Sequence, residues 1–179
     1  PSEIFLSERS QDSPGSVIVS SLEGSRTFLV EVQALVSASS SIGIPRRTVS
    51  GFDQIRMTLL VAIMEKRLGL GLSGEDIFVN VAGGIKLAEP AADLGTAAAI
   101  AGSFKNQPID PQTVMIGEVG LTGEVRSVMQ LEARLAEAER LGFKRCVIPF
   151  SAKKGRGLPK SSMDLQYVKS LAEAFDVVF

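Results

Sequence analysis

The residues best placed to do chemistry lie in one stretch, EPAADLGTAAAIAG, from Glu89 to Gly102. Pro90 suits the first position of a helix because it has no N–H group to leave unpaired, and Glu89 and Asp93 place negative charge beside the positive end of the helix dipole. A helix start of this kind can present a reactive group to substrate. The run of alanine and glycine also permits close packing against a sheet, so both interpretations stay open here.

Two other motifs match known patterns, but their context argues against chemistry. GLGLSG, at 69–74, has the glycine spacing of a dinucleotide site, yet it closes a predicted helix and precedes a strand, which is the reverse of the order that such a site needs. SAKK, at 151–154, has the serine–lysine spacing of penicillin-binding enzymes, but it lies in a polar loop without their companion motifs. No G-x-x-x-x-G-K-[ST] phosphate loop occurs, so we expect the chain itself not to bind ATP.

The chain contains no histidine and a single cysteine, Cys146. We therefore expect no metal site and no Ser-His or Cys-His nucleophile pair. Cys146 lies within the apolar run RCVIP, where a buried strand residue is predicted. An enzymatic role would have to depend on lysine, serine, threonine or a carboxylate.

Two groups of basic residues are candidates for binding DNA phosphates. The net charge of -1 predicts no overall attraction to nucleic acid, so local groups of cations would have to supply the contact. Each group could also be an ordinary solvated loop. The first group is Arg46, Arg47 and Arg56, and the second is Lys153, Lys154, Arg156 and Lys160.

The hydrophobic pattern predicts an α/β fold, with one mixed sheet and helices packed against it. A hairpin is expected at 16–22 and 28–36, followed by an exposed loop. The S-x-x-D pair Ser50 and Asp53 predicts the start of a helix that Gly69 ends. Further strands are expected at 76–84, 113–121, 123–128 and 145–149, and further helices from Pro90, at 130–141 and at 164–175.

Length and composition are those of a single soluble domain. The chain has 179 residues, of which 45% are hydrophobic and 22% are charged. No apolar run approaches the ~20 residues of a membrane helix, and the first residues show no signal-peptide pattern. A reducing compartment such as the cytoplasm is expected.

Several segments together resemble one known family. VNVAGGIKLAEPAADLGTAAAIA, IGEVGLTGEVRSV and EAERLGFKRCVIP follow each other as in the C-terminal Lon-protease-like domain of the RadA (Sms) family of bacterial DNA repair proteins. PSEIFLSER and VEVQALVSASSSIGIPRRTVSGFDQIRM resemble the part of those proteins just after their ATPase core. The resemblance implies the fold shared by Lon proteolytic domains and the second domain of ribosomal protein S5. It also implies that 1–14 are a linker from a missing ATPase core and that 15–179 form one globular Lon-like domain.

The Lon peptidases use a serine and a lysine, and the resemblance places neither here. Ala91 stands at the position of the serine and Glu132 at that of the lysine. A small shift in alignment does not restore the pair, since 82–101 contain no serine and 114–141 no lysine. We therefore expect no catalytic residues in this chain.

Replacement of the lost pair by other residues is the alternative to be weighed. Thr96 could act as a hydroxyl nucleophile in a residual Ser/Thr-Lys type peptidase, but it falls inside the predicted helix without an exposed turn. Lys86, Asp93 and Glu132 could gather at the old site, where a structural ion pair is the favoured interpretation.

The resemblance further implies a role for the whole protein. It would be a hexameric DNA-dependent ATPase of recombinational repair that drives branch migration, with ATP, Mg²⁺ and Zn²⁺ bound by domains outside this chain. This domain would serve as ring scaffold and DNA-binding module, without a cofactor of its own. The implied partners are single-stranded or branched DNA, further copies of the chain, and the recombinase RecA, and no membrane. A small-molecule kinase on the S5-like fold is disfavoured because VAGGIK lacks the serines of a phosphate loop.

Overall fold

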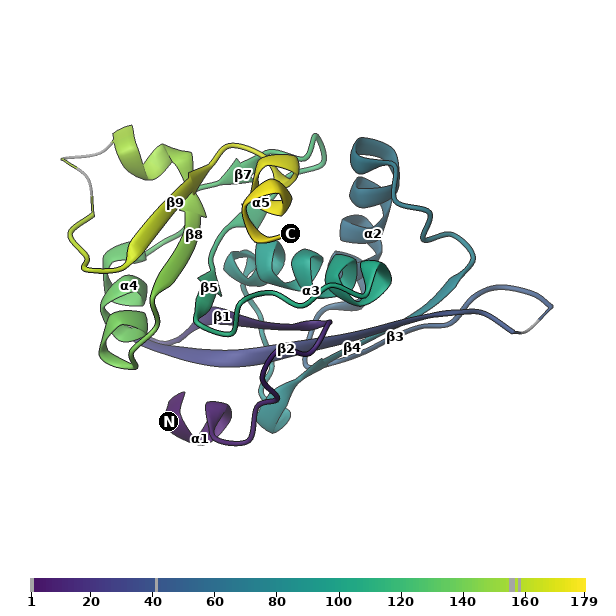
Figure 1. Cartoon of the computed structure of the whole chain (residues 1–179), viewed down its shortest axis with the longest axis horizontal. Coiled ribbons are helices and arrows are strands. Elements are labelled where there is room, and N and C mark those ends of the chain that lie inside the picture. The colour runs from purple at the N-terminus through teal and green to yellow at the C-terminus, as the bar shows by residue number, and fades with distance from the viewer. Residues whose placement is uncertain (1, 41, 155–156, 158) are drawn as a thin grey trace.

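A seven-stranded mixed sheet with helices on both faces organises the molecule, as a computed structural model of residues 2–40, 42–154, 157 and 159–179 shows (Figure 1). The strand order is β3-β4-β2-β1-β5-β8-β9. The antiparallel pairs are β1 with β2 and β2 with β4, and the remaining neighbours are parallel. The predicted α/β class with one mixed main sheet is confirmed. The strands are β1 (Ser16–Glu23), β2 (Arg26–Ala38), β3 (Arg47–Ser50), β4 (Glu75–Val81), β5 (Thr113–Met115), β8 (Arg145–Pro149) and β9 (Asp164–Val168).

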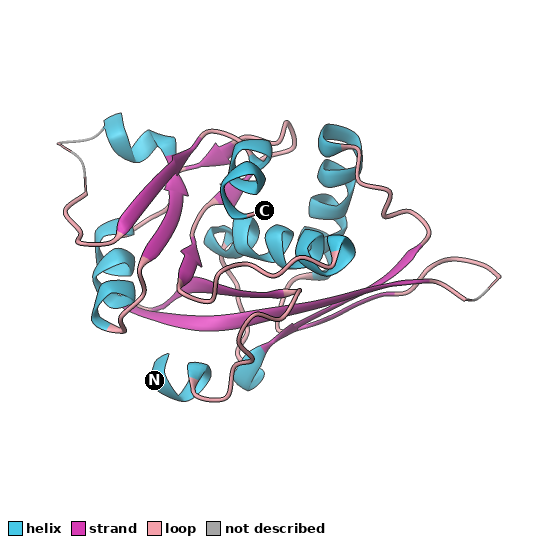
Figure 2. Cartoon of the chain, viewed as in Figure 1, coloured by secondary structure: helices cyan, strands magenta, loops and turns pink. Residues whose placement is uncertain are grey.

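The helices divide between the two faces of the sheet (Figure 2). The α-helices are α1 (Ser2–Leu6), α2 (Gln54–Leu68), α3 (Asp93–Lys105), α4 (Leu131–Arg140) and α5 (Leu171–Val178). The 3-10 turns are η1 (Ala82–Gly84), η2 (Pro90–Ala92) and η3 (Phe150–Lys154), and β6 (Glu118–Val119) pairs with β7 (Val125–Arg126). Side chains of α2, α3 and α5 share one apolar core, and those of α4 share a second core with the opposite face of β1 and β2.

Alternation along the central hairpin explains the two cores. Val17, Val19 and Val30 point toward α3, whereas Ile18 and Leu29 point toward α4. A strand that is covered on both faces needs apolar residues at successive positions, and SVIVSSL and FLVEVQALV supply them. None of the described helices is long and apolar enough to cross a membrane.

The expected elements differ from the structure at several places. The segment 113–121 was expected as one strand, but it contains β5 of the main sheet and then β6, which belongs to a separate two-stranded sheet. The segment 164–175 was expected as one helix, but Asp164–Val168 is the edge strand β9, which pairs in parallel with β8. The helix α5 begins only after Ser170, whose hydroxyl accepts a hydrogen bond from the N–H of Glu173. The short strand β3 was also missed, since its place beside β4 is set by pairing and not by its own pattern.

The ends of α2 agree with the sequence except for the capping residue. Asp53, and not Ser50, is the N-cap, and its carboxylate accepts the N–H of Arg56 at 2.8 Å. Gly69 adopts the left-handed conformation, φ 67°, and ends the helix. GLGLSG is therefore a helix end followed by a turn, as its context predicted.

Residues 2–14, which were expected to be a linker, include α1, and α1 packs on β2. Ser2 is buried, and its hydroxyl donates to the carboxylate of Glu137 and accepts the N–H of Leu29. These contacts hold the first helix against the face of the sheet that α4 covers.

Candidate functional site

The start of α3 is built as the sequence predicted, from Pro90 and a series of small residues. Pro90 opens the turn η2, and Ala91 and Ala92 follow it, both buried. Two backbone hydrogen bonds fasten this start to the chain after β5: the N–H of Leu94 donates to the carbonyl of Gly117, and the N–H of Gly117 donates to that of Ala91. The position expected to match the Lon serine is therefore a buried methyl group in a fixed turn.

Close packing accounts for the glycine inside this helix. A Cβ atom at Gly95 would lie 2.2 Å from Cγ1 of Val19 on β1, closer than any side chain tolerates. Every residue from Asp93 to Gly102 is buried. The small-residue run thus lets α3 approach the sheet, which favours the packing interpretation over a reactive turn.

Asp93, the first residue of α3, forms a buried ion pair with Arg56 on α2. Its side chain is fully buried, whereas that of Arg56 is 33% exposed. Both Nε and Nη2 of Arg56 donate to the carboxylate, which also accepts the N–H of Val119. Burial raises the pKa of Asp93, although Arg56 and the Val119 N–H both favour the charged form.

A second buried ion pair joins Glu89 to Arg134 on α4. Nη1 and Nη2 of Arg134 donate to the two oxygens of Glu89 at 2.7 Å each. Arg134 is fully buried, and it also donates to the carbonyls of Met129 at 2.9 Å and Ser20 at 3.0 Å. This fork ties α4, β1 and the residue before Pro90 into one network.

The structure does not bring the other expected residues together with Asp93. Lys86 and Glu132 are exposed, and the carboxylate of Asp93 pairs instead with Arg56, which was not expected in this group. A hollow of about 590 Å³ opens beside the helix start, lined by 51–53, 55–56 and 86–90. Thr96 is fully buried inside α3, and its hydroxyl has no hydrogen-bond partner within the described part of the chain.

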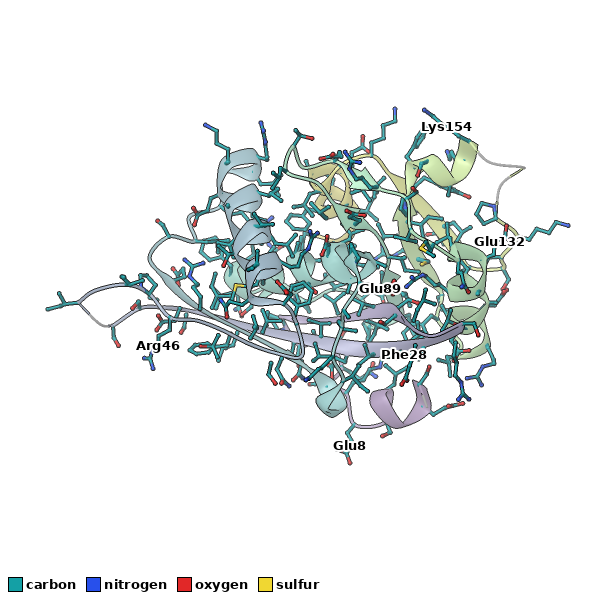
Figure 3. The ribbon with its side chains drawn as sticks, turned by 180° about the vertical axis from the view of Figure 1, so that it is seen from behind. Glu8, Phe28, Arg46, Glu89, Glu132 and Lys154 are labelled. Atoms are coloured by element: carbon teal, nitrogen blue, oxygen red, sulfur yellow. The ribbon has the colours of Figure 1, made fainter. Side chains whose placement is uncertain are left out.

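Arg46 of the first basic group and Lys154 of the second lie toward opposite ends of the molecule, with Glu89 between them (Figure 3). Arg46 is 67% exposed, and its Nε lies 3.7 Å from the carboxylate of Asp76. Arg47 is half-buried and donates to the carbonyl of Leu72 at 2.9 Å. Arg56 faces Asp93, as described above.

In the second group, Lys153, Lys154 and Lys160 are exposed. Arg156 lies outside the described residues. The described residues contain no cluster of three or more histidine, cysteine or acidic side chains that could hold a metal ion.

A comparison with protein families identifies where the chain belongs. The family model described as subunit ChlI of Mg-chelatase matches residues 30–152, from within β2 to within η3. The chain belongs to this ChlI family. The matched region contains both buried ion pairs, and the description belongs to the family as a whole and assigns no reaction to this chain.

Three relatives of this ChlI-family chain are each named DNA repair protein RadA. The chain is 51% identical over 174 residues to a DNA repair protein RadA of Bacillus subtilis and 50% identical over 177 residues to one of Halalkalibacterium halodurans. It is 43% identical over 179 residues to a DNA repair protein RadA of Streptococcus pyogenes. These matches cover 97–100% of the chain but only 38–39% of each relative, so the chain spans about two fifths of their length.

Sequence reasoning missed Arg134, the central residue of the site in this ChlI-family chain. A signal was present, because Arg134 occupies the same helical stripe as Leu131, Leu135 and Ala138, three residues after the first. An arginine on the buried stripe of a short helix needs a carboxylate or several carbonyls to satisfy it. Its partner Glu89, 45 residues earlier, could not be named without the fold.

Proposed function

We propose that this chain is a Lon-like domain without peptidase activity in a DNA repair protein of the RadA kind, where it contributes to a hexameric ring and contacts DNA. The support comes from relatives named DNA repair protein RadA, which match nearly the whole chain at 43–51% identity. The observation that carries the proposal is the pairing of the two carboxylates at the start of α3, Glu89 and Asp93. Both carboxylates are held by arginines of the same chain, while exposed cations lie at the two ends of the molecule.

The absence of peptidase activity is proposed from the chemistry of the helix start. Ala91 has no nucleophile, and the hydroxyl of Thr96 is buried in the middle of α3 without a base beside it. Lys86 is exposed whereas Thr96 is buried, so the two side chains do not share one protected site. Among the described residues at this helix start, we therefore infer no hydroxyl–lysine pair for acyl transfer.

Digestion of casein by the purified chain tests this part of the proposal. No cleavage is expected, from the chain as it is or from its Lys86→Ala and Thr96→Val variants. Cleavage that disappears in either variant would establish a residual Ser/Thr-Lys type peptidase instead.

DNA contact is proposed at both basic ends, with Arg46 and Arg47 as the first site. The Arg46 side chain is 67% exposed and lies 3.7 Å from the carboxylate of Asp76, so a phosphate can reach its guanidinium group. The buried Asp76 would keep its hydrogen bond from the backbone N–H of Arg46, at 2.7 Å. A guanidinium group forms paired hydrogen bonds to phosphate, which suits this role. Arg56 is a weaker candidate for phosphate contact, because its guanidinium group pairs with Asp93 and only 33% of its side chain is exposed.

The first DNA site is tested by fluorescence anisotropy with a single-stranded oligonucleotide over a range of salt concentrations. The double variant Arg46→Ala/Arg47→Ala is expected to bind more weakly and to lower the slope of log K against log salt by about 0.7 for each lost contact. Lys66→Ala/Arg67→Ala, on α2, is the matched control because it removes two neighbouring exposed cations. An equal loss in both double variants would mean that only net charge matters.

For the whole protein, we propose an ATP-driven motor for branch migration outside this chain, working in the cytoplasm with RecA. The relatives are more than twice as long as the chain, which leaves room for that motor and for its ATP, Mg²⁺ and Zn²⁺ sites. This domain itself needs no cofactor in the proposal. Sedimentation of the chain tests the ring directly, because a hexamer and a monomer differ six-fold in mass.

A further inference from the structure

Phe150 lies outside both apolar cores of the described residues, at the point where β8 leads into η3. Its ring is half-buried, and two ammonium groups lie over it. Nζ of Lys169 is 4.5 Å from the ring centroid and Nζ of Lys153 is 5.3 Å from it. Packing in an apolar core therefore does not explain the position of this ring or the two ammonium groups that contact it.

A second ring belongs to the same cluster. Nζ of Lys153 also lies 4.7 Å from the ring centroid of Tyr167, on the edge strand β9, so one ammonium group is shared by two rings. A hollow of about 370 Å³ adjoins them, lined by Val125, Ser151, Phe150, Lys154 and Lys169. We call the set Phe150, Lys153, Lys154, Tyr167 and Lys169 the Phe150 platform.

The platform carries three lysines, and none of them forms a salt bridge with a described carboxylate. Glu173 is the acid beside it, and its carboxylate accepts the backbone N–H of Lys169. Glu124 is engaged by Arg126 and Thr122. Three cations and two rings therefore share one end of the sheet.

An anion that also carries a planar ring fits this combination, and a nucleotide is such a ligand. In a single strand the faces of the bases are free to stack on protein rings, while lysines hold the phosphates. In a duplex the base faces are already stacked on each other, so Phe150 would gain nothing. Cation–π contacts at exposed sites are weak, so a base can replace one ammonium group, which then moves to the adjoining phosphate.

We propose that the Phe150 platform binds one nucleotide of single-stranded DNA, with the base stacked on Phe150 and the phosphate held by Lys154 and Lys169. This rests on the proposed DNA-contacting function and adds to it a preference for single strands. It also extends the second basic group predicted from the sequence by one further lysine, Lys169, and by two aromatic residues, Phe150 and Tyr167.

The test compares three DNAs in fluorescence anisotropy with the 179-residue chain: an oligothymidylate, an abasic strand of the same length, and a duplex. Phe150→Leu is expected to weaken binding of the oligothymidylate by about five-fold or more, the lower end for loss of one stacked base. Binding of the abasic strand and the duplex should not change. Phe150→Tyr, which keeps a ring, should bind as the unaltered chain does.

Two further variants separate stacking from charge and from folding. Lys169→Gln is expected to weaken binding of the oligothymidylate and the abasic strand alike, and to lower the salt slope by about 0.7. Phe104→Leu, a half-buried phenylalanine of α3, is the matched control and should change none of the affinities.

The outcomes separate the platform from the function on which it rests. If the chain binds the oligothymidylate and the abasic strand equally and Phe150→Leu changes neither, the platform is refuted while DNA contact stands. An equal loss on both strands in Phe150→Leu would also refute stacking. If the chain binds none of the three DNAs, both the platform and the DNA-contacting function fall.

Discussion

Removing Glu89 should leave a fully buried arginine without its counter-charge, and this is the most severe test of the network at the helix start. In Glu89→Ala, Arg134 keeps its hydrogen bonds to the carbonyls of Ser20 and Met129 but loses both bonds to the carboxylate. Its side chain has no exposed surface through which water could replace them. The perturbation therefore creates a buried, unpaired positive charge.

The expected cost follows from that burial. Breaking a buried ion pair by removing one partner costs about 3–5 kcal/mol of the free energy of unfolding, because the remaining charge stays desolvated. A chain of this size loses about 2–4 °C of melting temperature per kcal/mol, so a fall of roughly 6–20 °C is expected. Arg134→Met should cost less, since Glu89 is 23% exposed and can turn to water.

Urea denaturation followed by circular dichroism measures these differences. The double variant Glu89→Ala/Arg134→Met removes both charges and should recover at least about 1–2 kcal/mol relative to Glu89→Ala. Glu132→Ala, an exposed acid on the same helix, is the control and should stay within about 0.5 kcal/mol of the unaltered chain. A cost below about 1 kcal/mol for Glu89→Ala, or a double variant less stable than that single one, would refute the reasoning.

Three further predictions concern Asp93, Gly95 and Cys146. Burial raises the folded-state pKa of Asp93, so its contribution to stability should fall as the pH rises above the unfolded pKa of about 4. In urea titrations Asp93→Asn should therefore gain stability relative to the unaltered chain as the pH rises from about 4, and a constant difference would contradict this. Gly95→Ala should cost about 1–3 kcal/mol in the same assay by pressing on Val19, whereas Gly71→Ala, with open space around it, should cost far less; equal effects would show that α3 can shift. Complete burial raises the pKa of the Cys146 thiol, so Ellman's reagent should label it only after unfolding, and rapid labelling of the folded chain would count against its place in the core.

Local signals in the sequence predicted much of the fold. Gly69 marked the end of α2, Pro90 marked the start of the turn before α3, and β-branched runs marked the central hairpin. Each of these depends on the conformational preference of a few neighbouring residues. The edge strands β3 and β9 were missed because their conformation is decided by pairing with β4 and β8, which a local pattern does not contain.

The candidate site was only partly predictable for the same reason. Glu89 and Asp93 were recognised as acids at a helix start, but their partners Arg134 and Arg56 lie 45 and 37 residues away in sequence. Helix periodicity alone would have marked Arg134 as buried, yet nothing in the spacing says which carboxylate it meets. Partner choice emerges only when α2 and α4 are placed around α3.

The two ion pairs also suggest why a helix start that does no chemistry would keep its acids. Asp93 joins α3 to α2 on one face of the sheet, and Glu89 joins the same turn to α4 on the other. The start of α3 is thus a junction between the two layers, and two ion pairs fix it. Removing one partner of a buried ion pair lowers the free energy of unfolding of the protein. The proposed function requires a rigid junction at this helix start and no nucleophile.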